Sequence, residues 1–192
     1  MVKNSNSAFD KLTAYDKETG ELNVVIETPK DSRNKYAYDE KLGIFILKGV
    51  LAVGHSFPYD FGYIPQTKGG DGDPLDVLVL MDEPAFAGCL VPSRLIGIIE
   101  AEQTELDGKV ERNDRLIAVA SDSHNHSDIK SINDLNGKLI DEIEHFFVSY
   151  NQAKGKEFKL LGRFGAQKAR KIIENGMKLY KKPKGKFQTK KK

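Results

Sequence analysis

The stretch GGDGDPLDVLVL, residues 69–80, joins an acidic turn to an apolar run. Asp71, Asp73 and Asp76 are crowded into six residues, and the run that follows them predicts a strand buried on both faces. The glycines allow tight backbone geometry and Pro74 fixes a bend, so the acids are held close together on a rigid support. We therefore expect the chemistry of this protein to be concentrated at the turn.

A hard divalent cation is one explanation for three neighbouring aspartates. Like charges repel at short distances, and a cation bound by carboxylate oxygens relieves that repulsion. A solvated acidic turn without a ligand is the simpler alternative and stays open at this point. A calcium-binding EF-hand loop starting at Asp71 does not fit, because its fifth position would be Leu75, its sixth Asp76 in place of glycine and its twelfth Asp82 in place of glutamate.

Around this turn, the first two thirds of the chain are predicted to be rich in short strands. Apolar and alternating runs bounded by turn residues are typical of strands. The expected strands are residues 22–27, 35–38, 43–47, 76–81, 95–101 and 116–120, with a hairpin turn at 106–109. Several short strands with brief connections favour a barrel or a sandwich.

The last third of the chain changes to a helical period. From Lys138 to Tyr150, apolar residues fall at helical spacing behind the turn residues Asn136 and Gly137. A second amphipathic helix is expected to begin near Ala166. The elements together predict an α+β fold, a small β-barrel with two main helices packed on it.

Composition indicates one globular domain over residues 1–180, because the chain of 192 residues is 39% hydrophobic and 30% charged. The net charge of +2 includes seven lysines in residues 181–192, a run typical of a disordered basic tail, and subtracting them leaves −5 for the rest. We expect no specific nucleic-acid partner. No apolar run approaches the roughly 20 residues of a membrane span, and the N-terminus lacks the apolar section of a signal peptide, so a cytoplasmic protein without a membrane partner is expected.

The motif Asp71-x-Asp73-Pro74-Leu75-Asp76 resembles the signature of the family I soluble inorganic pyrophosphatases, and the similarity extends from about Val24 to Ile173. The supporting matches are Val24-Val25-Ile26-Glu27-x-Pro29, Lys35-Tyr36, Phe57-Pro58-x-x-Phe61-Gly62-Tyr63-Ile64, Leu116-Ile117-Ala118-Val119, Ile132-Asn133-Asp134-Leu135, and His145-Phe146-Phe147-x-x-Tyr150 with Lys154-Gly155-Lys156. The resemblance implies a five-stranded OB-like barrel carrying helices, Mg²⁺-dependent hydrolysis of pyrophosphate to two phosphates, and a homo-oligomer.

The resemblance also implies a role for each matching residue. Pyrophosphate is a dense anion whose hydrolysis needs charge neutralisation, in-line positioning and an activated water. By resemblance, Asp71 and Asp76 are metal ligands, and the catalytic Asp73 orients or deprotonates the attacking water. The implied substrate-binding residues are Glu27, which reaches a substrate-borne metal, Lys35 and Tyr150, which contact phosphate, and Arg115, which stands where the family has a lysine.

Several positions depart from the family pattern. The family's second glutamate, phosphate-binding arginine, two active-site tyrosines and a later lysine are replaced here by Ala37, Gly49, Phe57, Phe61 and Asn151. Each lost donor is typically worth about 1–3 kcal/mol of binding. The losses are compatible with a slow pyrophosphatase, with a hydrolase adapted to another phosphoanhydride or phosphate ester, or with a catalytically silent binding or regulatory relative.

Two further metal-binding positions of the family fall at Gln103 and Asn113, in a region with an insertion. Glu102 and Asp114 lie one residue away from them. A shift of one residue along a strand reverses the face on which a side chain lies. We therefore expect Glu102 and Asp114 to serve as metal ligands if the insertion changes the register.

Overall fold

The computed structural model describes residues 7–181, and the expected tail beyond Lys181 lies outside this range. The elements in the described range are η1 (Ala8–Lys11), β1 (Leu22–Thr28), β2 (Asn34–Asp39), β3 (Ile44–Val50), β4 (Asp60–Ile64), β5 (Leu75–Leu80), β6 (Leu90–Thr104), β7 (Val110–Arg112), β8 (Arg115–Ala120), η2 (Ile132–Asp134), α1 (Gly137–Gln152), β9 (Glu157–Gly165) and α2 (Ala166–Lys181).

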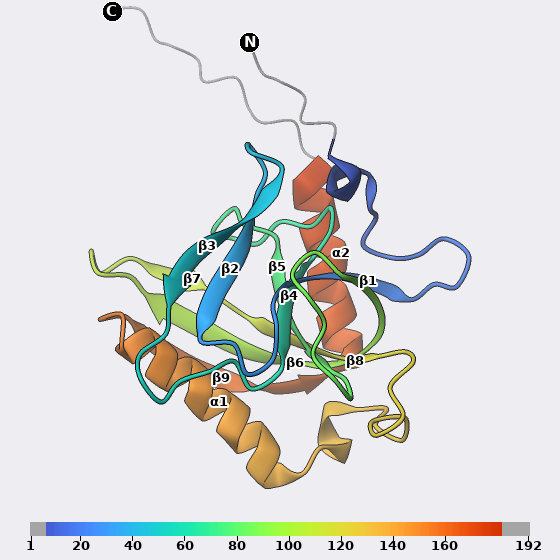
Figure 1. The fold of residues 1–192 in the computed structure, drawn as a ribbon. Helices are drawn as coiled ribbons and strands as arrows, with labels where there is room; N and C mark the ends of the chain where they lie inside the picture. Colours follow the sequence, from blue (N-terminus) through green and yellow to red (C-terminus); the bar gives the residue numbers. More distant parts are fainter. Residues whose placement is uncertain (1–6, 182–192) are drawn as a thin grey trace, which may run out of the picture.

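Five strands pair in a ring, in the order β1, β4, β5, β8, β6 and back to β1. The β5–β8 pair is parallel and the other four pairs are antiparallel, so the sheet is mixed. β7 and β9 pair with the second half of the long strand β6, and β2 and β3 form a separate hairpin (Figure 1). Two helices with a mixed sheet confirm the predicted α+β class.

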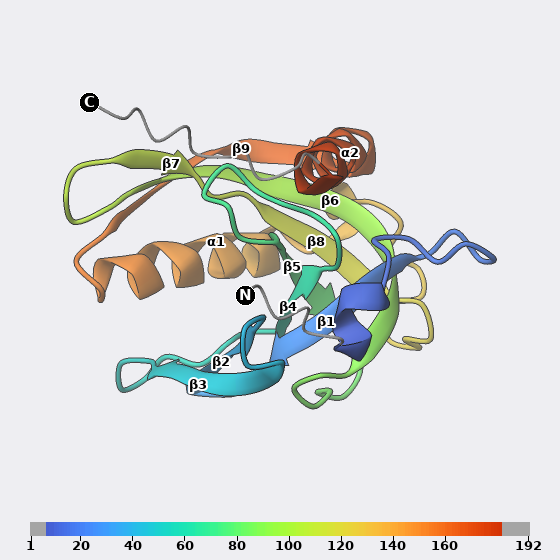
Figure 2. The ribbon, with the colours of Figure 1, turned by 90° about the horizontal axis from the view of Figure 1, so that it is seen from above.

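The two faces of β5 belong to different hydrophobic cores. Leu78 and Leu80 pack in the core that includes α1, whereas Val77 and Val79 pack in the core that includes α2. The two helices accordingly lie on different sides of the sheet (Figure 2). Burial on both faces explains the uninterrupted apolar run in the sequence. Because side chains alternate along a strand, Asp76 is in phase with Leu78 and faces the side of α1.

Helix α2 supports the base of the acidic turn. A Cβ atom on Gly176 would lie 2.8 Å from Leu75 Cδ1, so glycine is what lets the helix approach β5 this closely. The Lys68 amide donates a hydrogen bond to the Gly176 carbonyl oxygen at 3.1 Å. The turn is therefore fixed to the helix on one side and to the sheet on the other.

The structure extends the elements expected from the sequence. The six expected strands and both helices are present within a few residues of their expected positions, but β4, β7 and β9 were not expected and β6 is longer than expected. The strand β9 shows the alternation of a half-buried strand in its first residues, where only Phe158 is buried. Neither of the helices within residues 7–181 has the length and apolar character of a membrane span.

Asp60 gives a pH-dependent test of this fold. It is fully buried on β4, where burial raises the pKa of its carboxyl from 3.8 to about 6, although the Ala85 amide donates to Oδ1 at 3.0 Å. The folded protein therefore keeps a proton that the unfolded chain releases, and stability falls as pH rises from about 4 to about 6. Asp60→Asn should be more stable than the parent protein at pH 8 by on the order of 2–3 kcal/mol, and close to it at pH 4.

Denaturant unfolding of both proteins between pH 4 and pH 8 measures this difference. Asp16→Asn is the matched control, because hydrogen bonds from the Thr19 and Glu18 amides to Oδ1 lower the pKa of Asp16. The stability that Asp16 contributes is complete above its ordinary pKa and is lost only at more acidic pH. Its variant should therefore show a constant difference over the same range. If the free energy of unfolding of Asp60→Asn differs from that of the parent protein by the same amount at every pH, Asp60 does not have the raised pKa on which the prediction rests.

Candidate functional site

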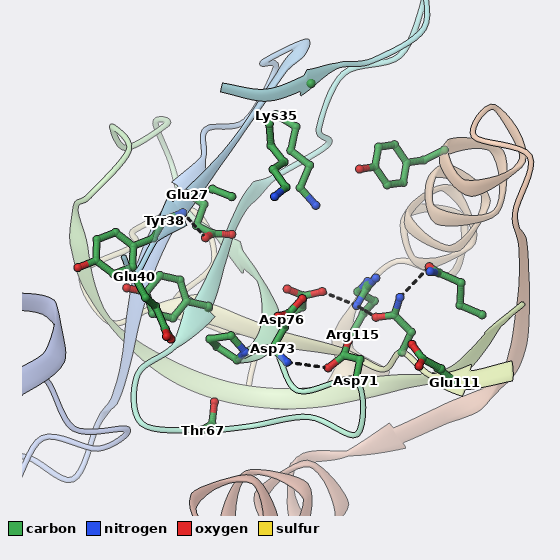
Figure 3. Close-up of a pocket in the computed structure, with 18 of the residues that line it drawn as sticks. Glu27, Lys35, Tyr38, Glu40, Thr67, Asp71, Asp73, Asp76, Glu111 and Arg115 are labelled. Carbon is green, nitrogen blue, oxygen red and sulfur yellow. Dashed lines mark hydrogen bonds and ion pairs between the residues drawn. The ribbon is translucent and has the colours of Figure 1, made fainter. Parts of the chain in front are cut away.

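A cavity of about 670 Å³ lies between the acidic turn, the β2–β3 hairpin and the C-terminal end of α1. Figure 3 shows its carboxylates facing Lys35, which extends from β2 on the opposite side. Seven of the nine residues expected from the sequence line this cavity: Glu27, Lys35, Asp71, Asp73, Asp76, Arg115 and Tyr150.

Glu102 and Asp114 are not among the residues that line the cavity, whereas Gln103 and Asn113 are. The reason lies in the phase of β6. Ala101 belongs to the core on the side of α1, and Gln103, two residues further, shares its face, so Glu102 lies on the opposite face. The Asp114 carboxylate accepts a hydrogen bond from the Ala101 amide at 3.0 Å. The structure therefore does not show the register change on which the expectation for Glu102 and Asp114 depended.

The acidic turn is shaped by its own hydrogen bonds. Asp71 Oδ1 accepts from the Asp73 amide at 3.0 Å, and the Gly69 amide donates to the Asp73 carbonyl oxygen at 2.7 Å. Gly72 has a φ of 98°, a conformation that side-chain-bearing residues rarely adopt. The glycines thus allow a closed turn that presents several carboxylates to one cavity.

The carboxylates of the cavity interact unfavourably with one another. Burial, together with the charges of Asp76 and Asp73, raises the pKa of Glu27 to about 7, although a hydrogen bond from the Tyr38 amide at 2.8 Å and the charge of Lys35 act to lower it. Partial burial raises the pKa of Asp71 as well, again with contributions from Asp73 and Asp76. The cavity therefore favours anything that neutralises its carboxylates, a proton or a cation.

Two ammonium groups form the other side of the cavity. Lys154 Nζ donates a hydrogen bond to Tyr150 Oη and lies 3.9 Å from the ring centroid, and Lys35 Nζ lies 5.8 Å from the same centroid. Burial acts to raise the pKa of Tyr150, but the two ammonium groups outweigh it and lower the pKa. Within the described chain, neither lysine forms an ion pair with a carboxylate. This side of the cavity can therefore accept an anion.

The sequence alone gave Lys154 no functional role. It follows Tyr150 by four residues, the spacing that places two side chains on one face of a helix. That spacing could have indicated that Lys154 lies beside Tyr150, although α1 itself ends at Gln152.

Arg115 lies between the carboxylates and the core. Its Nη1 donates to Asp76 Oδ2 at 2.6 Å and also to Asn113 Oδ1. Its guanidinium carbon lies 5.0 Å from the ring centroid of Phe147 and 5.6 Å from that of Phe158. The residue is only 5% exposed, so its position is set by the protein around it.

Contacts within the protein account for three of the departures from the family motif. Phe57 and Phe61 are buried in the core that includes α1, where their rings contact each other. The Asn151 side chain donates to the Phe147 carbonyl oxygen at 2.8 Å and is thereby used within the helix. Gly49 lines the cavity but offers no side-chain donor. Phosphate donors at the cavity must therefore come from elsewhere, and Lys154 is such a group.

Both the sequence and the fold are similar to those of known proteins. Residues 24–181 match the family model described as inorganic pyrophosphatase. An inorganic pyrophosphatase of Synechocystis sp. is 39% identical over 164 residues, which cover 85% of this chain and 94% of the relative. One of Corynebacterium glutamicum is 39% identical over 161 residues, covering 83% and 98%.

Solved structures show the same similarity. An inorganic pyrophosphatase from Thermus thermophilus superposes with a TM-score of 0.82 at 33% identity, covering 91% of this chain and 99% of the other. One from Neisseria gonorrhoeae gives a TM-score of 0.82 at 31% identity, with the same coverage. The likeness therefore covers the cavity as well as the ring of strands.

Proposed function

The chain belongs to the inorganic pyrophosphatase family, and from this we propose that it hydrolyses inorganic pyrophosphate to two phosphates in the cavity. The observation that carries the proposal is the opposition of charges across that cavity. Asp71, Asp73 and Asp76 lie on one side, and the ammonium group of Lys35 faces them from the other (Figure 3). Lys154 also lines the cavity, and its ammonium group lies beside the same Tyr150 ring as that of Lys35. A diphosphate accompanied by divalent cations is complementary to both sides.

We propose Mg²⁺ as the cation, with Asp71 and Asp76 as its ligands. The donors are carboxylate oxygens, which suit a hard cation. Burial, with the neighbouring aspartates, raises the pKa values of Glu27 and Asp71, so a bound cation would favour their charged forms. Among residues 7–181, no three His, Cys, Asp or Glu side chains are already grouped closely enough to hold a metal ion. The carboxylate donors fit Mg²⁺ in their chemistry. We infer that the aspartate side chains move closer together when the ion binds. When bound, Mg²⁺ would neutralise the substrate and increase the acidity of water.

In this proposal the residues of the chain divide the remaining work. Asp73 orients the attacking water and accepts its proton, because it lies between the two ligand aspartates on the same turn. Lys35 and Lys154 hold phosphate oxygens, and Tyr150 donates to the product-side phosphate. Glu27 faces a cation carried by the substrate.

The remaining expectations are part of the same proposal. We infer that the ring of five strands is the OB-like barrel of the family, that residues 1–180 form one domain, and that the protein acts in the cytoplasm as a homo-oligomer. These inferences rest on the family resemblance and on the sequence composition. Glu102 and Asp114 are not retained as metal ligands, because they lie outside the cavity lining.

Phosphate release from pyrophosphate, with and without Mg²⁺, tests the proposal. The parent protein should release phosphate from pyrophosphate in preference to nucleotides and phosphate esters, and only with the metal. Asp71→Asn and Asp76→Asn should each abolish this activity. Thermal stability without metal should hold or rise in Asp71→Asn, because one of several repelling carboxylates is removed. It should fall in Asp76→Asn, because the buried Arg115 loses its ion-pair partner. The stabilisation produced by Mg²⁺ should shrink in both variants.

Asp128→Asn serves as the control, because Asp128 is exposed and does not line the cavity. It should retain both activity and the Mg²⁺-induced increase in melting temperature. If Asp71→Asn and Asp76→Asn show the same Mg²⁺-induced increase in melting temperature as the parent protein, the assignment of Asp71 and Asp76 as metal ligands is contradicted. Preferential cleavage of a larger phosphorylated metabolite would instead show that the cavity serves a different substrate.

Lys154→Ala tests the phosphate-binding side. Losing one charged donor should lower kcat/KM for pyrophosphate by roughly 10- to 100-fold, the equivalent of about 1.5–3 kcal/mol. Lys159→Ala is the matched control, because Lys159 is exposed on β9 and does not line the cavity. Steady-state kinetics at fixed ionic strength compare the two. Equal kcat/KM values for both variants would exclude Lys154 from substrate binding.

A further inference from the structure

Arg115 is a buried cation whose strongest partner is a proposed metal ligand. It begins β8 and is in phase with Ile117 and Val119, which belong to the core on the side of α1. That phase directs the side chain toward the rings of Phe61, Phe147 and Phe158, which lie 5.0–5.9 Å from the guanidinium carbon. Aromatic faces attract such a cation and limit its movement.

The Nη1 nitrogen that donates to Asp76 has two further polar partners. Asn113 Oδ1 and the Asp114 carbonyl oxygen accept from Nη1, the latter at 3.0 Å. The Asn113 amide in turn donates to Gln103 Oε1 at 2.7 Å, so it is itself held in place. These amides carry no charge and leave Asp76 as the one carboxylate that forms an ion pair with Arg115 in the described chain.

The Arg115–Asp76 ion pair lies where its two groups are poorly solvated. The side chain of Arg115 is 7% exposed and that of Asp76 is 29% exposed. A charge-assisted hydrogen bond in such a setting is stronger than one in water. A divalent cation that binds Asp76 must therefore compete with a cation that the protein already supplies.

We propose that Arg115 is a positioning residue that acts as an internal counter-cation for Asp76 and competes with metal for this carboxylate. The inference deepens the proposed function, on which it rests by taking Asp76 as a metal ligand. It assigns Arg115 a role different from the direct phosphate contact expected from the sequence. Asp76 is held in place before metal binds, and metal binding without substrate is weakened.

Calorimetric titration with Mg²⁺ in the absence of pyrophosphate tests the proposal. Arg115→Met and Arg115→Gln both remove the charge, and methionine can fill the space between the three rings without a polar group. Both variants should bind Mg²⁺ at least about tenfold more tightly than the parent protein, because Asp76 has lost its competing partner. Arg115→Lys restores a positive charge and should return the affinity toward the parent value.

Lys35→Gln is the matched control for loss of one positive charge from the cavity. Lys35 forms no ion pair with Asp76, so its removal should raise the Mg²⁺ affinity much less than removal of Arg115. Equal effects at the two positions, or Mg²⁺ affinity that is unchanged or weaker in both neutral Arg115 variants, would overturn the proposal. Pyrophosphate hydrolysis by the parent protein is measured separately, so failure of the proposed function is distinguishable from failure of this inference.

Discussion

Repulsion between carboxylates at the acidic turn is the constraint on which the rest of the site depends. Asp71, Asp73 and Asp76 cannot remain close together unless the backbone holds them and positive charge balances them. The fold supplies the first requirement through β5, which is buried on both faces, and through α2, which approaches the turn at Gly176. A flexible loop with the same residues would move its acids apart into water.

Three of the cations that line the cavity come from different parts of the fold. Lys35 comes from the β2–β3 hairpin, Lys154 follows α1, and Arg115 begins β8. The two lysines have no carboxylate partner in the described structure, whereas the arginine is paired with Asp76. Lys35 and Lys154 are therefore available to an anion, whereas Arg115 belongs to the scaffold. The cavity can thus bind a highly charged substrate without being strongly charged itself.

Much of this arrangement was predictable from local sequence patterns. The apolar run of β5 and the helical spacing of α1 and α2 each report on burial, and the motif at residues 71–76 located the acidic side of the cavity. The strand β4 was not predicted, although Phe61 and Gly62 within it were recognised as part of a motif. A motif identifies residues without stating their backbone conformation. The strand β9 was missed because only one residue of its alternating pattern is buried.

Contacts between distant residues were beyond local patterns. Whether Gln103 or Glu102 faces the cavity depends on the phase of β6, which is fixed at these residues by its pairing with β7 and β9. Likewise, Arg115 looked like a phosphate ligand because its position matched a lysine, yet the rings around it and its ion pair with Asp76 arise only from tertiary packing. The electrostatic role of a residue depends on the residues that surround it in the folded protein, and a single sequence does not show which residues those are.

The central claim is that the cavity separates a cation-binding side from an anion-binding side. A crystal structure of the protein with Mn²⁺ and imidodiphosphate, a pyrophosphate analogue that resists hydrolysis, tests it most directly. Anomalous scattering should place Mn²⁺ against the carboxylates of Asp71 and Asp76, with phosphate oxygens in contact with Lys35 and Lys154. Manganese bound away from the turn, or the analogue bound with its phosphates distant from both lysines, would contradict the account.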